Sequence, residues 1–290
     1  MANTRGPFMD VVKTIDAARE ALSKARGGSR KVGLVPTMGA LHPGHLSLIK
    51  RAREECKVTV VSVFVNPAQF GVDEDLDTYP RDTAKDAELC KAEGANILFM
   101  PEPAEMYPSG YATYVLQERY TDPFEGELRT GHFHGVCTIC CKLFNIVRPD
   151  VAYFGQKDYQ QTVVVRRMAA DLNIPVEIRV SPIVRESDGL AMSSRNSYLS
   201  PTEREQATVL YRALTAAKEL FEEGERSGRA LFAAMRAVFD KTPQARLDYA
   251  AVANPETLRE LARVESKAVL LVACRIGRTH LIDNMLLTVP

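Results

Sequence analysis

The sequence predicts an α/β fold, in which a doubly wound parallel sheet is followed by a second, smaller α+β domain. In the first two-thirds of the chain, short β-branched apolar segments alternate with segments of helical periodicity, as in a parallel sheet covered by helices on both faces. This pattern changes near Ser181-Pro182, and two long apolar segments close the chain. A length of 290 residues is also typical of two domains. We therefore expect domains at residues 1–183 and 184–290.

Five segments are expected to form strands of the sheet, because each is short, β-branched and apolar on both faces. They are Val32–Val35, Val58–Val65, Ile97–Met100, Val151–Phe154 and Val176–Val180. Helices are expected to begin near Ile15, Leu46, Asp82, Val136 and Tyr159. Asp82 is a candidate N-cap, and Gly94 is a candidate left-handed residue at the end of the same helix.

The second domain is expected to contain two helices and an antiparallel hairpin. Residues 200–203 read Ser-Pro-Thr-Glu, a capping box with Pro at the first helical position. The helix that follows carries apolar residues as far as Phe221, and a second helix is expected around Met235. Ala268–Ile276 and His280–Leu287 are separated by three residues, which predicts a hairpin.

Composition and charge exclude several classes of protein. Apolar residues make up 46% and charged residues 26% of the chain, as in ordinary globular proteins. Lys+Arg and Asp+Glu are both 37, and this zero net charge argues against a nucleic-acid-binding protein. No apolar run approaches the roughly 20 residues of a membrane helix, and the N-terminal segment lacks the apolar core of a signal peptide. With only six cysteines, a reduced cytoplasmic protein is expected.

The first segment expected to carry chemistry spans residues 36–45, directly after the first strand. Ligands bind at the carboxyl ends of strands in an open α/β sheet, and the N-terminus of the next helix suits a phosphate. His42 and His45 are three residues apart and can face one ligand, while Gly44 lets the backbone come close. A surface turn with two solvated histidines is the alternative, and the position after the strand favours nucleotide binding.

Two further loops carry cations suited to phosphate. Lys157 follows the fourth strand and supplies a point charge, Asp158 can cap the next helix, and Gln161 can hydrogen-bond a small polar substrate. Arg195 lies between hydroxyl residues and Asn196, which is typical of a phosphate clamp on a mobile loop. Taken singly, each segment could also be an ordinary charged loop or surface turn.

Uncharged polar residues form the remaining candidate site. Asn66 and Gln69 follow the second strand, and their amides can bind carboxylate, hydroxyl or amine groups. Turn chemistry at Asn-Pro explains Asn66 but not Gln69. Arg129 could meet an anion, whereas His132 and His134 in the same loop could equally be solvated.

In order and spacing, these segments resemble the pantoate–β-alanine ligase family. The matching stretches are PTMGALHPGH, VFVNPAQF, RTGHFHGV, YFGQKDYQQ and LAMSSRNSYL. The resemblance implies a Rossmann-like fold of the nucleotidyltransferase type and the ATP- and Mg²⁺-dependent joining of pantoate to β-alanine. It also implies a pantoyl-adenylate intermediate, release of AMP and pyrophosphate, and a homodimer built on the first domain.

The resemblance further implies residue roles. The expected catalytic residues are His45, His42, Lys157 and Arg195, with His45 as proton donor. The ATP site is expected to comprise Met38, Gly39, Ala40, Leu41, His42, Pro43, Gly44, His45, Gly155, Gln156, Lys157, Asp158, Val184, Met192, Ser193, Ser194 and Arg195. Pantoate and β-alanine are expected to contact Gln69, Gln161, Asn66 and Arg129. Closure of the second domain would bring Arg195 over ATP and exclude water.

Two positions qualify these roles. Many members of the family carry Glu where this chain has Gln156, so no acid role is assigned there. Asp86 is a weak candidate for an outer Mg²⁺ contact, and solvation on a helix face is the preferred expectation for it. No residue is expected to bind a metal directly.

Two other functions are compatible with parts of the sequence. The His-x-Gly-His loop and the later basic loop also resemble class I aminoacyl-tRNA synthetases, but no anticodon domain is evident and zero net charge disfavours tRNA. Cys137, Cys140 and Cys141 follow His132 and His134. These residues could supply the ligands of a metal site or the thiols of a redox module. These cysteines share the apolar face of a predicted helix, which favours packing.

Overall fold

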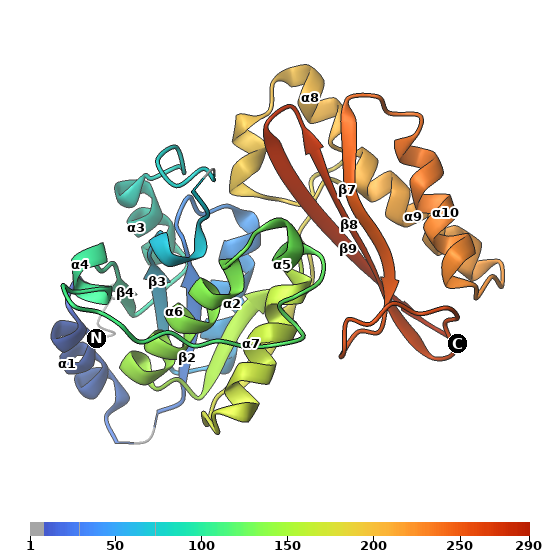
Figure 1. Cartoon of the computed structure of the whole chain (residues 1–290). Helices are drawn as coiled ribbons and strands as arrows, with labels where there is room; N and C mark the ends of the chain where they lie inside the picture. Colours follow the sequence, from blue (N-terminus) through green and yellow to red (C-terminus); the bar gives the residue numbers. More distant parts are fainter. Residues whose placement is uncertain (1–8, 29, 73) are drawn as a thin grey trace, which may run out of the picture. The chain divides into compact units, whose positions relative to one another are not determined.

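The chain folds into two units, each with its own sheet and hydrophobic core (Figure 1). The computed structural model describes residues 9–28, 30–72 and 74–290. The first unit comprises the described residues up to Gly155 together with Val164–Ser181. The second unit comprises Gln156–Val163 and Pro182–Pro290.

The first unit is built on a six-stranded parallel sheet, which confirms the predicted doubly wound architecture. From edge to edge the order is β1-β4-β3-β2-β5-β6, so the winding direction reverses between β2 and β5. Ligands bind at the carboxyl ends of strands at such a reversal. The strands are β1 (Asp10–Val12), β2 (Val32–Thr37), β3 (Val58–Val63), β4 (Ile97–Phe99), β5 (Val151–Gly155) and β6 (Glu177–Ser181).

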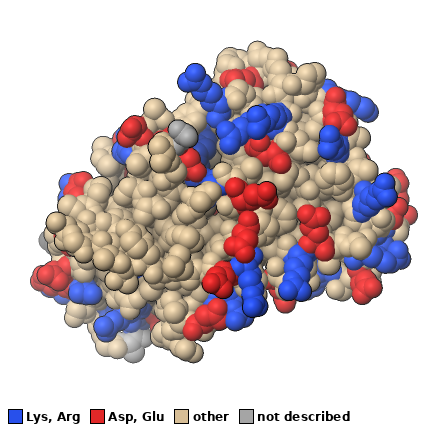
Figure 2. Space-filling model, viewed as in Figure 1, with Lys and Arg blue, Asp and Glu red and all other residues tan. Residues whose placement is uncertain are grey.

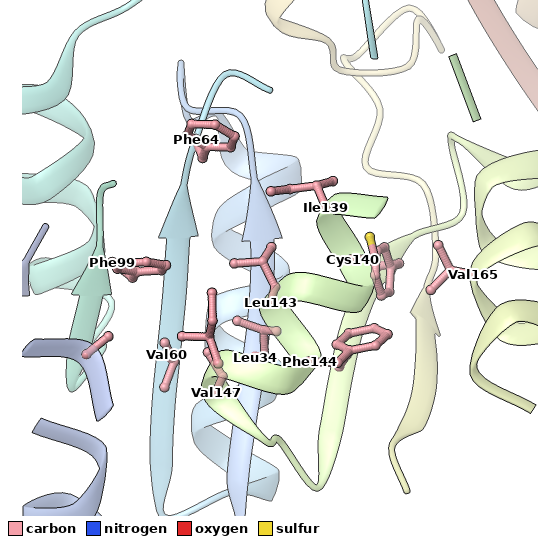
Figure 3. Packing of buried hydrophobic residues seen from close by; sticks show 14 of the residues in the cluster. Leu34, Val60, Phe64, Phe99, Ile139, Cys140, Leu143, Phe144, Val147 and Val165 are labelled. Carbon is pink, nitrogen blue, oxygen red and sulfur yellow. The ribbon is translucent and has the colours of Figure 1, made fainter. Parts of the chain in front are cut away.

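Helices cover both faces of this sheet. On one face lie α1 (Ile15–Arg26), α6 (His132–Val147) and the part of α7 (Tyr159–Asp171) that belongs to the first unit. On the other face lie α2 (Pro43–Glu55) and α3 (Thr83–Ala92). Figure 3 shows Leu143, Phe144 and Val147 of α6 against Leu34 and Val60 of the strands. Each such side chain contributes about 1.5–3 kcal/mol by burial.

Short helices complete the first unit. They are η1 (Pro67–Gln69), α4 (Pro103–Met106) and α5 (Glu125–Leu128). Helix α3 begins and ends where local signals predict. The Asp82 side chain caps α3 by accepting from Lys85 N, and Gly94 just beyond that helix has a φ of +80°.

The second unit contains an antiparallel sheet of β7 (Ala245–Ala253), β8 (Lys267–Ile276) and β9 (Thr279–Thr288). The β8–β9 hairpin confirms the prediction, whereas β7 was not predicted, because its sequence mixes polar residues with small alanines. Side chains of α9 (Val209–Glu222) and α10 (Gly228–Phe239) share one core with this sheet. The remaining elements are η2 (Ser194–Tyr198) and α8 (Pro201–Gln206).

One helix expected in the second unit is in fact two. The capping box at Ser200 and Glu203 begins α8 as predicted, but α8 ends at Gln206 and α9 begins at Val209. The Thr208 hydroxyl donates to the Glu205 carbonyl at 2.8 Å. Such a local side-chain bond competes with regular helix, so apolar spacing alone predicted one continuous helix.

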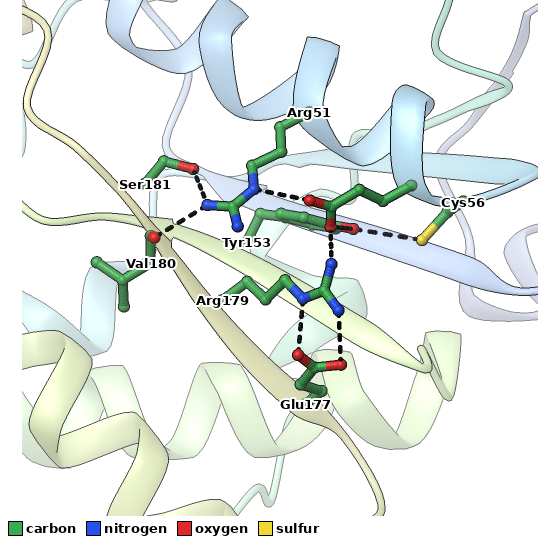
Figure 4. A network of polar contacts seen from close by, with 8 residues as sticks. Arg51, Cys56, Tyr153, Glu177, Arg179, Val180 and Ser181 are labelled. Carbon is green, nitrogen blue, oxygen red and sulfur yellow. Dashed lines mark hydrogen bonds and ion pairs between the residues drawn. The ribbon is translucent and has the colours of Figure 1, made fainter.

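A polar network fastens the C-terminal half of α2 to the sheet (Figure 4). The Glu55 carboxylate accepts from Arg51 Nε at 2.9 Å, from the Tyr153 hydroxyl at 2.8 Å and from Arg179. Burial raises the pKa of Glu55, but these three hydrogen bonds outweigh it and lower that pKa to about 2. Arg51 Nη1 also donates to Ser181 Oγ at 3.1 Å, at the end of β6.

Surface charge is mixed rather than segregated on the face drawn in Figure 2, where basic and acidic side chains are interspersed. This mixing agrees with equal numbers of basic and acidic residues. None of the helices in the described part of the chain is long and apolar enough to cross a membrane.

Candidate active site

His42 and His45 stand together where α2 begins. His42 is the N-cap, and its Nδ1 accepts from Gly44 N at 3.1 Å. In return, His45 Nδ1 accepts from His42 N at 3.4 Å, which completes a capping box. The two ring centroids are 4.1 Å apart. The sequence therefore predicted correctly that both histidines lie at the N-terminus of a helix that follows a strand.

These hydrogen bonds determine which tautomer each neutral histidine adopts. A backbone N–H can only donate, so Nδ1 of His42 and of His45 must accept. The proton of each neutral ring therefore lies on Nε2. A phosphate oxygen can accept from an Nε2–H group, and the positive end of α2 favours an anion at the same place.

Asp86 fixes the loop that leads to the histidines, and its expected solvation is wrong. The side chain is 2% exposed, because it reaches back from α3 to accept from Ala40 N at 3.0 Å and Leu41 N at 2.8 Å. Burial raises the pKa of Asp86, while these two bonds oppose the rise. Gly39 has a φ of +85°, and a Cβ there would lie 2.8 Å from Asp86 Oδ2, so only glycine fits.

Asn66 is buried at the carboxyl end of β3 and directs its amide inward. Its Oδ1 accepts from the Tyr107 hydroxyl at 2.7 Å and from Ala68 N at 3.3 Å. Its Nδ2 donates to Gln69 Oε1 and to the Gly135 carbonyl, each at 3.1 Å. These four bonds use the full hydrogen-bonding capacity of the amide. Within the first unit, Asn66 therefore orients Gln69.

Gln69 consequently presents a donor. Its Oε1 accepts from Asn66, and its Nε2 donates to Met38 Sδ at 3.0 Å. Its backbone carbonyl accepts from His132 Nδ1 at 2.8 Å. The structure thus brings Met38, Asn66 and Gln69 together, although they come from two different loops. A side chain that offers N–H groups suits a substrate rich in oxygen atoms.

Arg129 and His132 support the Gln69 backbone. Arg129 donates to Glu74 through Nε at 2.8 Å and Nη2 at 2.6 Å, and its Nη1 lies 3.2 Å from His132 Nε2. Because arginine only donates, His132 Nε2 accepts and its Nδ1–H donates to Gln69. Burial, with Arg129 nearby, lowers the pKa of His132 to about 4. Both histidines that were expected in a loop lie in the first turn of α6, where His132 is buried and His134 is exposed.

We expect His132 to make the protein less stable in mild acid. The unfolded chain binds a proton at His132 near pH 6.5, whereas the folded chain binds it only near pH 4. Stability from the neutral side chain is therefore complete above pH 6.5 and is lost as the pH falls towards 4. The loss amounts to about 3 kcal/mol. Urea unfolding of His132→Asn at several pH values should show a shallower decline than that of the parent protein.

The exposed His134 supplies the matched control for that measurement. His134→Asn should leave the decline of the unfolding free energy with pH unchanged. Equal declines in the parent protein and in His132→Asn would contradict the assignment of a buried neutral imidazole.

In the second unit, residues 184–192 form a tight antiparallel loop. Met192 N donates to the Val184 carbonyl at 3.0 Å, and Glu186 N donates to the Leu190 carbonyl at 2.8 Å. Val184 and Met192 therefore lie side by side, as a shared role at one ligand would require. Ser193, the next residue, accepts from Arg195 N at 3.3 Å and caps η2, which contains Ser194 and Arg195.

The Lys157 loop belongs to the same unit as Arg195. Lys157 Nζ lies 3.6 Å from Asp158 Oδ1, and the Asp158 carbonyl accepts from Thr162 N in the first turn of α7. Gln161 is half-buried in that turn. The sequence predicted strand β9 but gave no role to two of its residues: Asp283 binds Arg185, and Asn284 binds the Lys157 loop.

Metal-binding and redox roles for the cysteines are disfavoured by their surroundings. Cys137 and Cys140 lie in the hydrophobic core along α6, and burial raises the pKa of the Cys137 thiol to about 12. A metal or a redox reaction requires a thiolate. Among the described residues, no group of three or more His, Cys, Asp and Glu side chains is arranged to hold a metal ion.

A match over nearly the whole chain decides the family. The family model described as pantoate–β-alanine ligase matches residues 10–286. The chain belongs to the pantoate–β-alanine ligase family. It is accordingly an enzyme, a ligase that joins pantoate to β-alanine with ATP as co-substrate.

Relatives and solved structures of this family agree over full length. A pantothenate synthetase of Roseiflexus castenholzii is 57% identical over 279 residues, covering 96% of this chain and 99% of the relative. The crystal structure of pantothenate synthetase from Thermus thermophilus has a TM-score of 0.92 at 47% identity and covers 96% of this chain and 99% of its own. A pantoate–β-alanine ligase from Francisella tularensis, complexed with βγ-ATP and β-alanine, has a TM-score of 0.78 at 32% identity, with coverage of 96% and 98%.

Proposed function

We propose that this ligase makes pantothenate in two steps through an enzyme-bound pantoyl adenylate. A carboxylate oxygen of pantoate attacks the α-phosphorus of ATP, and pyrophosphate leaves. The amine of β-alanine then attacks the acyl carbon, AMP leaves with the bonding electrons, and the amine loses a proton. No protein nucleophile is needed, so catalysis depends on orientation and on stabilising charge at phosphorus. The paired histidines at the N-terminus of α2 carry this proposal.

In the first unit, His42 and His45 are the proposed phosphate donors. Each neutral ring carries its proton on Nε2, and a hydrogen bond from there to a phosphate oxygen strengthens as charge develops in the transition state. His45 is the proposed proton donor to that oxygen. Met38, Gly39, Ala40, Leu41, Pro43 and Gly44 would complete this side of the nucleotide site.

Gln69 is the proposed donor to pantoate oxygens, because Asn66 occupies its Oε1 and leaves Nε2 as the polar group to offer. A direct contact between Asn66 and β-alanine stays a prediction and would require one of the four bonds of its amide to break. Arg129 would likewise have to exchange Glu74 for a substrate carboxylate.

In the second unit, Lys157, Ser193, Ser194 and Arg195 are the proposed phosphate ligands. Gln161 is the proposed partner of pantoate oxygens, and Gly155, Gln156, Asp158, Val184 and Met192 would complete the nucleotide site. We also propose that the lid carries Arg195 and closes to exclude water. The domain limits 1–183 and 184–290 stay a prediction. The units of the structure differ from them, because Gln156–Val163, Pro182 and Ile183 belong to the second unit.

Mg²⁺ is proposed to enter bound to the phosphates of ATP. Both carboxylate oxygens of Asp86, the one carboxylate considered for it, already accept from backbone N–H groups. When bound, Mg²⁺ would neutralise phosphate charge. We further propose a homodimer built on the first domain, from the family resemblance, and a cytoplasmic location, which suits six free cysteines.

Isotope exchange tests the adenylate directly. With ATP, Mg²⁺ and pantoate but no β-alanine, labelled pyrophosphate should exchange into ATP, because the first step is complete and reversible without the amine. No single amino acid should support exchange, which separates this enzyme from an aminoacyl-tRNA synthetase. Exchange that appears only after β-alanine is added would rule out formation of the adenylate as a separate step that precedes reaction with the amine.

A further inference from the structure

We infer that Asn284 is a positioning residue for Lys157. It lies in β9 and is 1% exposed. Its Nδ2 donates to the backbone carbonyls of Gln156 at 2.9 Å and Lys157 at 2.8 Å. Its Oδ1 accepts from Gln156 Nε2 at 3.1 Å. One buried amide therefore holds the whole loop that carries the lysine, and this inference rests on the proposed role of Lys157 at the phosphates.

The strand that carries Asn284 is itself firmly placed. β9 pairs with β8 along its full length, with Asn284 opposite Leu271. Side chains alternate between faces along a strand. Leu281 and Leu287 pack in the core with α9 and α10, and Asp283 points the same way, where it binds Arg185. Asn284 therefore points to the opposite face of the sheet and meets the Lys157 loop there.

Fixing the backbone at residue 157 matters because the flexible side chain of a lysine does not by itself fix the position of its ammonium group. Its ammonium sits on four flexible carbons and lacks the planar geometry that orients arginine. The hydrogen bond from Asn284 reaches the carbonyl of Lys157 itself, so it fixes the point from which the side chain extends. Because the backbone is already fixed, less conformational entropy is lost when the lysine side chain becomes ordered around a phosphate group at each turnover.

The same geometry explains why glutamine suits position 156. Both N–H groups of Asn284 are used by the two backbone carbonyls. Its Oδ1 therefore faces the side chain of residue 156 and requires a donor there. Gln156 supplies one. A glutamate at this position would place a carboxylate against Oδ1 with no hydrogen between them.

Two substitutions test the inference. Asn284→Asp keeps the shape but removes both donors, and the KM for ATP should rise on the order of 10- to 100-fold. Gln156→Glu introduces the acceptor clash without touching the buried strand, and a rise of about 3- to 10-fold is expected. The KM for pantoate should change by less than about twofold in both variants. If Asn284→Asp does not fold, Gln156→Glu combined with Lys157→Ala decides the matter. A rise in the KM for ATP that persists without Lys157 would come from the new charge at the nucleotide site itself and would overturn the inference.

A double-mutant cycle separates positioning from general damage. Asn284→Asp added to Lys157→Ala should have almost no further effect on ATP kinetics, because the two residues act through one contact. As a matched control, Thr242→Val alters another buried polar residue of the second unit and should leave the KM for ATP unchanged. Additive losses, or equal rises in the KM for ATP and pantoate, would overturn the inference. If Lys157→Ala leaves ATP kinetics unchanged, the proposed role of Lys157 fails first, and the inference fails with it.

Discussion

Replacing Lys157 by alanine is expected to slow pantoyl-adenylate formation on the order of 10²–10³-fold. In the proposed site, the lysine would supply a full positive charge where the leaving pyrophosphate gains negative charge. Little stability should be lost, because its ammonium pairs with the half-exposed Asp158 at a distance of 3.6 Å. The measurement is single-turnover release of pyrophosphate from ATP and pantoate without β-alanine.

Lys218→Ala is the matched control for this variant. Lys218 lies in the same unit, on α9, and its ammonium pairs with Glu222 at 3.1 Å in solvent. Its loss should leave both the rate and the melting temperature unchanged. A nearly normal rate in a folded Lys157→Ala enzyme would remove Lys157 from the proposed phosphate site.

Replacing His45 by alanine is expected to cost a similar factor of about 10²–10³ in adenylate formation, because the proposed Nε2–H donor to the phosphate is lost. This variant also loses the Nδ1 acceptor of the capping box, so the free energy of unfolding should fall by about 1 kcal/mol. Rate and stability therefore change together in His45→Ala, and a second variant is needed to separate them.

His45→Asn makes that separation. The side-chain oxygen of asparagine can take the place of Nδ1 and keep the cap, but no group remains at the position of Nε2. Stability close to that of the parent protein, together with a rate as low as in His45→Ala, is the expected result. Recovery of the rate in His45→Asn would show that the histidine serves the helix cap rather than the phosphate. His134→Ala, at an exposed position, controls for loss of a histidine as such.

The sequence predicts those parts of the fold that depend on neighbouring residues. Five of the six strands in the parallel sheet were predicted with ends correct to within two residues, because buried parallel strands are rich in apolar residues. The position of His42 and His45 follows from an equally local signal, a strand followed by a helix start. β1 was missed because it begins with the charged Asp10 and is largely exposed, whereas β4, which is equally short, is entirely apolar and buried.

Residues that support the site could not be predicted, because their partners are far away in the chain. Asp86 has the spacing of an ordinary solvated helix residue, and only the folded chain brings it to Ala40 and Leu41. Tyr107 orients Asn66 across 41 positions. Asn284 holds residue 157 across 127 positions. Asp86 and Asn284 are identified by burial together with their hydrogen bonds, and Tyr107 by its hydrogen bond to Asn66; these are properties of the tertiary structure.

The network around Glu55 holds α2 at its C-terminal end, so a small tilt of the helix there moves its N-terminal end. The helix carries the histidine pair at its first turn and is clamped to the sheet near its last. A 13-residue helix is about 20 Å long. A tilt of roughly 3° at the clamp would therefore swing the imidazoles by about 1 Å, and a misplacement of that size can cost on the order of 10²-fold in rate. Accuracy at the proposed phosphate site would thus depend in part on contacts at the opposite end of the helix.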